Sequence, residues 1–183
     1  MNYSECNQVL KYLDRGDLEG LRCYAEKRKE AHYYSEARKL LERYLKAKNA
    51  FYKIVDESLI LTDGYSAYFL DDSSLLNDKY LKNMSKQFPV SYLDETTGII
   101  PIAERFENAD SFPVGRVETV DYNLYKVFSE DESFSKFFAK MHYNRPEIFL
   151  GENTEYRILK DKPVCLVRSP RGKGFVLGVN KRD

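Results

Sequence analysis

Between residues 4 and 48, apolar side chains recur at intervals of three and four residues, with charged residues between them. That spacing is typical of amphipathic helices. Gly16-Asp17 interrupts the pattern, because Gly is favoured just after a helix end and Asp at an N-cap. The pattern therefore predicts one helix before this dipeptide, a second after it and a third that begins near Tyr33.

An aromatic stripe of Tyr24, Tyr34 and Tyr44 runs along the predicted helices. Large aromatic side chains in such a stripe favour burial, either against the rest of the chain or against a second copy of it. The sequence leaves both alternatives open, so a homo-oligomer is one of the expected assemblies.

After Asn49 the pattern changes to short runs rich in Tyr, Val, Ile and Phe, separated by turn residues, which is typical of β-strands. Asp63-Gly64 predicts a tight hairpin, because both residues tolerate positive φ. Pro101 would confine its own segment to a sheet edge. The predicted strands or extended connectors are FYKIVD (51–56), SLILT (58–62), YSAYFL (65–70), TGIIPIAERF (97–106) and GRVETVDY (115–122), and FENADSFPVG (106–115) predicts a loop.

Two further helices are expected, at residues 73–88 and 131–142. The C-terminal part predicts a meander of four short strands with regular turns. These strands are EIFL (147–150), TEYRIL (154–159), VCLVRS (164–169) and FVLGV (175–179). The expected fold class is α+β, with a helical N-terminal module (1–48) followed by an antiparallel sheet domain (49–183) that carries two packed helices.

The bulk composition is that of a folded protein, with 183 residues, 43% of them hydrophobic and 32% charged, which is too apolar for a disordered chain. Fifteen Tyr and eleven Phe favour packing in a core; the alternative is an aromatic surface that binds another protein. The N-terminus has no signal-peptide pattern, and no apolar run approaches the roughly 18 residues that span a bilayer. Three widely spaced cysteines indicate reduced thiols, so we expect a cytoplasmic protein without membrane contact.

Charge is unevenly distributed along a chain whose formal net charge is zero. Residues 157–183 hold eight Lys/Arg and two Asp/Glu, whereas residues 49–120 hold six Lys/Arg and twelve Asp/Glu. The basic region contains RSPRGKG, in which Arg168, Arg171 and Lys173 stand on a predicted hairpin tip. Such a tip can contact a phosphate backbone or an acidic protein patch; the alternative is solubilising charge on a turn.

Acidic residues gather at the open end of the predicted 58–70 hairpin. Pairing of these strands would bring Asp56 and Glu57 toward Asp71 and Asp72, and hard cations take carboxylate ligands. Asp63 lies at the other end, as a turn residue. Solvated strand ends are the alternative to a binding site.

The sequence shows no catalytic residue set and predicts no metal site and no cofactor. His32 and His142 are far apart, and no cysteine pair has the spacing of metal ligands. Cys165 lies in an apolar strand, where burial would leave it unreactive.

The segments LILTDGYSAYFL and FSKFFAKM…EIFL…YRIL…PVCLV…GKGFVLGV resemble the DNA sliding-clamp fold, in which strand pairs and helices alternate and a curved sheet forms the outside. At the level of class, a small, Tyr-rich, charge-segregated chain without catalytic motifs also resembles the phage anti-CRISPR inhibitors. These resemblances imply a clamp-like fold, a phage or mobile-element origin and action on a nucleic-acid machine.

We therefore expect a non-enzymatic macromolecule-binding protein whose partner is a protein such as a nuclease or replication protein, DNA, or both. The second expectation is an inhibitor that binds and blocks a Cas nuclease. The third is a metal-dependent enzyme that uses the acids around Asp56 and Asp72.

Overall fold

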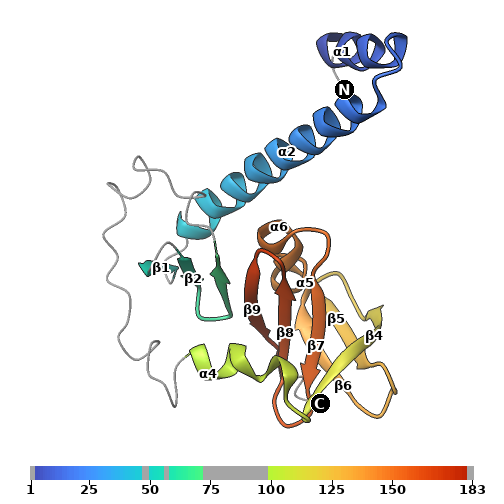
Figure 1. The fold of residues 1–183 in the computed structure, drawn as a ribbon. Coiled ribbons are helices and arrows are strands. Elements are labelled where there is room, and N and C mark those ends of the chain that lie inside the picture. The colour runs from blue at the N-terminus through green and yellow to red at the C-terminus, as the bar shows by residue number, and fades with distance from the viewer. Residues whose placement is uncertain (1–2, 47–49, 56–57, 72–98, 181–183) are drawn as a thin grey trace.

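The computed structural model describes residues 3–46, 50–55, 58–71 and 99–180. Two N-terminal helices precede a large antiparallel sheet, and short helices pack on both sides of that sheet (Figure 1). The predicted α+β class is confirmed. The helix expected at residues 73–88 lies outside the described residues.

The N-terminal helices are α1 (Tyr3–Asp14) and α2 (Leu18–Lys46). Gly16 separates them with a φ of 66°, a conformation that costs glycine little. Asp17 caps α2, since its Oδ1 accepts a hydrogen bond of 2.8 Å from the Gly20 amide. The predicted break is confirmed, but the second and third predicted helices form one continuous helix. After Gly20, no Gly or Pro occurs before Lys46 to end it.

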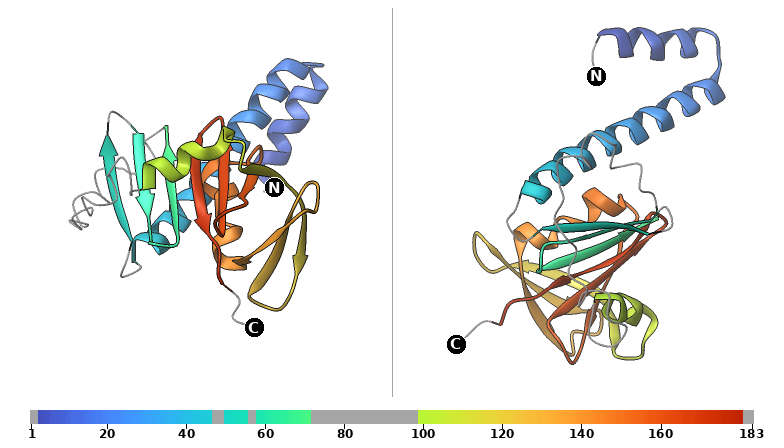
Figure 2. Two further views of the ribbon diagram at one scale, coloured as in Figure 1. Left: turned by 90° about the horizontal axis from the view of Figure 1, so that it is seen from below. Right: turned by 90° about the vertical axis from the view of Figure 1, so that its left-hand side faces the viewer.

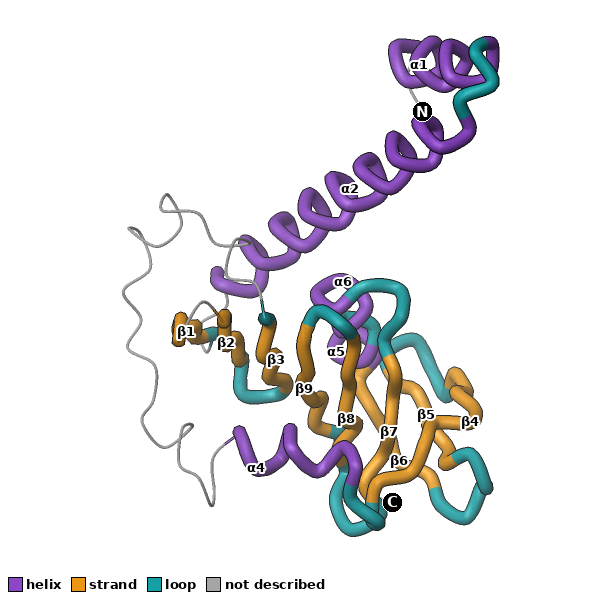
Figure 3. The backbone as a smooth tube through the Cα atoms, in the orientation of Figure 1, coloured by secondary structure: helices purple, strands orange, loops and turns teal. Residues whose placement is uncertain are grey.

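In the described residues, nine strands form one antiparallel sheet in the order β1-β2-β3-β9-β8-β7-β4-β5-β6 (Figure 3). The β2–β3 hairpin turns at Gly64, whose φ is 83°, as the Asp-Gly dipeptide predicts. The strands are β1 (Phe51–Val55), β2 (Ser58–Thr62), β3 (Ser66–Leu70), β4 (Ser111–Thr119), β5 (Leu124–Ser129), β6 (Ser135–Ala139), β7 (Glu155–Leu159), β8 (Val164–Ser169) and β9 (Gly172–Leu177).

The sheet curls so that the chain beyond β9 meets the edge strand β6. A bridge joins Val179 to Phe137, with the Val179 amide donating to the Phe137 carbonyl at 2.8 Å. Gly178 permits this approach, because a Cβ atom there would lie 2.7 Å from the Phe137 oxygen. Strands β4–β9 thereby form a partly closed, curved surface (Figure 2).

Side-chain alternation along the strands divides the apolar residues between two cores. One core contains Leu59, Val167 and Val176 and is covered by α2, α5 (Lys140–Tyr143) and α6 (Pro146–Leu150). The other contains Leu166 and Phe175 and is covered by α4 (Ile99–Ala103) and the 3₁₀ helix η3 (Glu104–Glu107). The sheet is therefore packed on both faces.

The middle of α2 belongs to the first of these cores. Ala37 and Leu41 are buried in the same cluster as the strand residues, and the Tyr33 hydroxyl donates a hydrogen bond to the Phe149 carbonyl in α6. Every side chain described in residues 4–36 is exposed or half-buried. The first half of α2 therefore projects from the sheet together with α1 (Figures 1 and 2). Division into domains at residues 48 and 49 stays a prediction.

The helix predicted at residues 131–142 is wrong. Residues 135–139 form β6, and Phe138 is fully buried opposite Tyr125 of β5. Asp131 does not cap a helix, because its Oδ1 accepts hydrogen bonds from the amide and hydroxyl of Ser133 and closes the β5–β6 loop. Only residues 140–143 are helical, as α5.

Two predicted strands are also wrong. EIFL lies in α6, where Pro146 occupies the first turn and Gly151 ends the helix with a φ of 88°. This Pro-before and Gly-after arrangement favours a helix. Most of TGIIPIAERF is helical, since residues 99–103 form α4 and residues 104–107 form η3. Pro101 therefore lies in a first helical turn and not at a sheet edge.

We predict that Leu41→Ala lowers the free energy of unfolding by about 2–5 kcal/mol, because it leaves a cavity in the core shared by α2 and the sheet. Lys39→Ala is the control on the exposed side of the same helix, and its ion pair with Glu36 stabilises by less than about 1 kcal/mol. Urea unfolding followed by circular dichroism measures both. Equal effects of the two substitutions would contradict burial of Leu41.

Candidate functional site

The basic residues predicted at a hairpin tip do not form one cluster. Arg168 and Lys173 are opposite one another on β8 and β9, on the side of η3. Arg168 pairs with Glu107 and with Glu155, and its guanidinium lies 4.3 Å from the centre of the Phe106 ring. Lys173 lies 3.8 Å from a carboxylate oxygen of Glu104. Both cations therefore have acidic neighbours within the protein.

Arg171 lies on the other side of the sheet, in the β8–β9 turn. Its guanidinium lies 3.8 Å from the centre of the Tyr33 ring of α2. This cation–π contact joins the turn to the N-terminal helix. The structure thus separates Arg171 from Arg168 and Lys173.

Of the acids predicted to converge at the hairpin end, Asp71 is the one within the described residues. It is exposed, and its amide donates a 3.1 Å hydrogen bond to the Arg171 carbonyl. Asp56, Glu57 and Asp72 lie outside the described residues, so the convergence of the four acids stays a prediction.

Asp63 has a role that its sequence position did not predict, because it is buried and accepts hydrogen bonds through both oxygens. Oδ1 accepts from the amides of Tyr65 and Ser66, at 3.0 and 2.9 Å, and closes the β2–β3 turn. Oδ2 lies 2.6 Å from Nη1 of Arg145, at the start of α6. The turn is therefore tied to a helix 82 residues further along the chain.

His142 completes this cluster from α5. Its Nδ1 lies 3.2 Å from Nη1 of Arg145 and 3.7 Å from Oδ2 of Asp63, and its ring stacks on Tyr65. Burial lowers the pKa of His142 and the Arg145 charge lowers it further, while the Asp63 carboxylate opposes both. The Ser66 hydroxyl also donates a 3.1 Å hydrogen bond to Oδ1 of Asp63. The evident effect of the cluster is to hold the β2–β3 hairpin against α5 and α6.

Cys165, which the sequence predicts to be unreactive, lies deep in the core. The predicted burial of Cys165 is confirmed, and burial raises the pKa of its thiol; its lack of reactivity stays a prediction. Among the described residues, no group of three or more His, Cys, Asp or Glu is arranged to hold a metal ion.

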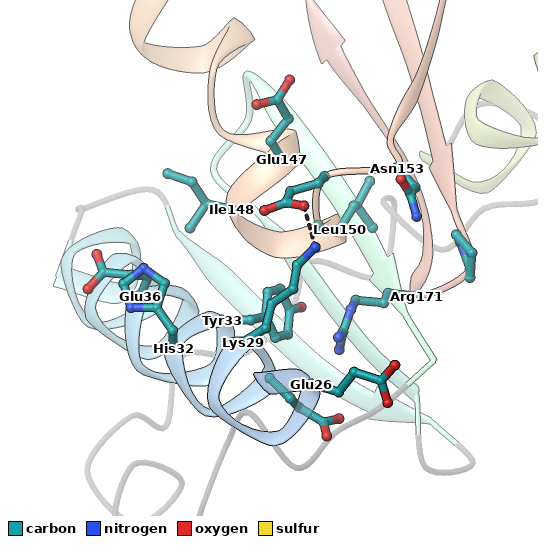
Figure 4. Close-up of a pocket in the computed structure, with 14 residues that line it drawn as sticks. Glu26, Lys29, His32, Tyr33, Glu36, Glu147, Ile148, Leu150, Asn153 and Arg171 are labelled. Atoms are coloured by element: carbon teal, nitrogen blue, oxygen red, sulfur yellow. Dashed lines mark hydrogen bonds and ion pairs between the residues drawn. The ribbon is translucent and has the colours of Figure 1, made fainter. Parts of the chain in front are cut away.

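A groove of about 510 Å³ lies between α2, α6 and the β8–β9 turn (Figure 4). Its floor is apolar, with Tyr33 from α2 and Ile148 and Leu150 from α6. The complete lining is Glu26, Lys29, Glu30, His32, Tyr33, Glu36, Glu147, Ile148, Leu150, Gly151, Glu152, Asn153, Pro170 and Arg171. It is the place where the N-terminal helix, the sheet and a later helix meet.

The groove is acidic, since five Glu side chains line it against two cations. Lys29 forms an ion pair of 2.5 Å with Glu152 across the groove, and Arg171 stacks on Tyr33 (Figure 4). Both cations therefore already interact within the protein. The sequence did not predict this site, because its walls come from segments more than 100 residues apart.

Within the described part of the chain, no helix combines the length and apolar character needed to cross a membrane. Comparison with protein-family models, with curated proteins and with solved structures found no match. The resemblance to the sliding-clamp fold and to the anti-CRISPR inhibitors stays a prediction.

We predict that Arg145→Met destabilises the protein by about 3–5 kcal/mol, because it leaves the buried Asp63 carboxylate without its cation. The double variant Arg145→Met/Asp63→Asn restores part of this loss, since the side-chain amide oxygen that Asp63→Asn introduces still accepts the turn hydrogen bonds. Urea unfolding of the single and double variants measures the coupling, with Arg22→Met in an exposed ion pair as control. Strictly additive effects would show that the two groups do not interact.

We predict that His142 makes stability depend on pH. Its pKa is lower in the folded protein than its ordinary value of about 6.5, so the unfolded chain binds more protons and stability falls as pH decreases from above 6.5 through the folded pKa. When the pH is lowered from about 7.5 to about 5, the free energy of unfolding therefore falls less in His142→Gln than in the wild type. The melting temperature across this range measures the effect, and His32→Gln, at an exposed histidine, is the control. If His142→Gln showed the same pH dependence of melting temperature as the wild type, His142 would not be the group responsible.

Proposed function

We propose that this chain is a non-enzymatic protein-binding protein, and that the groove between α2 and α6 receives a basic, amphipathic segment of a protein partner. The observation that carries the proposal is the composition of the groove, with five Glu above an apolar floor. A segment that combines Lys or Arg with apolar side chains matches both features. A basic partner segment is compatible with action on a nucleic-acid machine, because proteins that handle nucleic acid present basic surfaces.

Charge balance favours a cationic ligand. Three of the five lining glutamates have a cation nearby, since Glu152 pairs with Lys29, and Glu26 and Glu36 pair with Arg22 and Lys39. Glu30 and Glu147 stand on opposite walls, on α2 and α6, and neither forms an ion pair within the described residues. A Lys or Arg side chain entering between these walls would interact with carboxylates in a partly water-excluded space, where charge pairs gain more than in bulk water. The apolar floor would cover the aliphatic part of such a side chain.

The same charges disfavour direct contact with DNA. Phosphates would be repelled by the groove, and Arg168 and Lys173 have acidic neighbours on the other side of the sheet. Nucleic-acid affinity depends on basic side chains that are available to replace counterions. We therefore place the contact with the partner protein and not with its nucleic acid.

A second candidate function uses the same groove. If the basic segment belongs to the nucleic-acid channel of a nuclease, the acidic walls would compete with nucleic acid for it, which is the expected action of an anti-CRISPR-type inhibitor of a Cas nuclease. The third expectation, a metal-dependent enzyme, depends on Asp56, Glu57 and Asp72 and stays a prediction outside the described residues.

We predict that Glu30→Gln/Glu147→Gln weakens binding of labelled Lys/Arg-rich amphipathic helical peptides by about tenfold, as expected for the loss of about one to two kcal/mol of charge interaction. Glu19→Gln/Glu130→Gln removes the same charge from exposed positions outside the groove and leaves binding unchanged. Fluorescence anisotropy measures both, with Lys/Arg-to-Glu versions of the peptides as the negative probe. Equal binding of basic and acidic peptides would overturn the proposal.

The same titration is run with bare duplex DNA and with a Cas nuclease. We expect no DNA binding, and no change on replacing Arg168, Arg171 and Lys173 by Ala. Binding of the nuclease that is lost in Glu30→Gln/Glu147→Gln would support the inhibitor candidate. Tight, salt-dependent DNA binding that disappears in the triple Ala variant would instead assign the function to the basic residues.

A further inference from the structure

The α1–α2 hairpin carries an apolar surface that the rest of the described chain leaves uncovered. On α1, Val9 and Tyr12 are half-buried, and Tyr12 packs on Tyr24 of α2. A second stripe, Cys6, Leu10 and Leu13, follows at intervals of four and three residues, about a quarter turn around the helix. Leu10 and Leu13 are 53% and 49% exposed. The apolar face of α1 is therefore wider than the part that α2 covers.

The first half of α2 has a matching stripe. Leu18, Leu21 and Ala25 follow at intervals of three and four residues. Leu18 is 69% exposed and Leu21 is half-buried. This stripe lies about a quarter turn from Gly20 and Tyr24, the residues that meet α1.

Both stripes lie on the same side of the hairpin. The two helices run antiparallel, because Glu5 near the start of α1 pairs with Arg28 of α2, while Tyr12 meets Tyr24. Each stripe is rotated in the same sense from the contact between the helices, and in an antiparallel pair equal rotations lead to the same side. The hairpin therefore presents one apolar face two helices wide, named here the arm face: Cys6, Leu10, Leu13, Leu18, Leu21 and Ala25.

The arm face points away from the sheet. Ala37 and Leu41, which anchor α2 in the core, lie more than a quarter turn around the helix from Leu18 and Leu21. Figure 2 shows α1 and the first half of α2 projecting beyond the sheet. Within the described residues, the core and the groove thus leave the arm face uncovered.

We propose that the arm face binds the arm face of a second copy of this chain, so that two hairpins form an antiparallel four-helix bundle about a two-fold axis. The charges around it fit a second copy. From Lys11 to Arg22 there are three basic and three acidic residues, so the rim neither repels an identical rim nor selects a strongly charged partner. A two-fold interface uses the same surface on both subunits, which this face satisfies with leucine opposite leucine.

The size of the arm face sets the expected affinity. The 12 residues of α1 make it about 18 Å long, and two helices make it roughly 20 Å wide. This area, roughly 360 Å² per copy, is smaller than the roughly 800 Å² per partner of a standard interface, so the association is expected to be weak. We therefore expect a dimer with a dissociation constant in the micromolar range.

The test is sedimentation velocity of the full chain across concentrations from about 1 to 200 µM, a range that brackets micromolar affinity. Wild type is expected to shift from monomer to dimer. Leu10→Gln/Leu13→Gln, which removes four leucines from the dimer interface, is expected to raise the dissociation constant at least 100-fold. Gln is a good helix former, so α1 retains its structure. Helical signal by circular dichroism checks this directly.

The matched control is Cys23→Ser/Lys27→Gln, at exposed positions of α2 more than a quarter turn around the helix from Leu18, Leu21 and Ala25, which is expected to dimerise like wild type. A wild type that stays monomeric at 200 µM would overturn the proposal. So would a dimer that Leu10→Gln/Leu13→Gln does not weaken, because another surface would then be responsible. Neither leucine lines the groove, so binding of basic peptides stays unchanged and the outcome is independent of the proposed function.

Discussion

Burial of the middle of α2 in the sheet core is the interaction on which the arrangement of the molecule depends. Ala37 and Leu41 share a hydrophobic cluster with the central strands and with Phe149 of α6. Since α2 is a continuous helix of 29 residues, about 44 Å long, fixing its middle also fixes the direction of its first half. One contact region thus creates the groove beside α6 and holds the α1–α2 hairpin away from the sheet.

Electrostatics within the protein decides which charges remain for a partner. Arg145 and Asp63 neutralise each other in a buried site, and Arg168 has two carboxylates and an aromatic ring around it. The basic residues that looked available in the sequence are therefore largely occupied by internal contacts. In the groove, Glu30 and Glu147 form no ion pair with a described residue, which is why we propose a basic protein segment as its ligand.

Much of the fold could be predicted from sequence, because the signals were local. Gly16-Asp17 and Asp63-Gly64 mark turns through their own backbone preferences, and strands such as β2 (SLILT) and β8 (VCLVRS) contain short continuous apolar runs. Prediction failed where distant partners decide the structure. Phe138 becomes a strand residue by pairing with Tyr125, and Asp63 gains its ion pair from a helix 82 residues away. The groove was missed for the same reason, since its walls meet only in the folded chain.

Hydrogen exchange of individual backbone amides tests the central claim most directly. At a concentration below self-association, amides of residues 37–41 in α2 should open with nearly the same free energy as those of β8 and β9, because they belong to one cooperative core. Amides of α1 and of residues 21–30 should open more easily, since their side chains are exposed or half-buried. Uniform, weak protection along the whole of α2 would contradict the account.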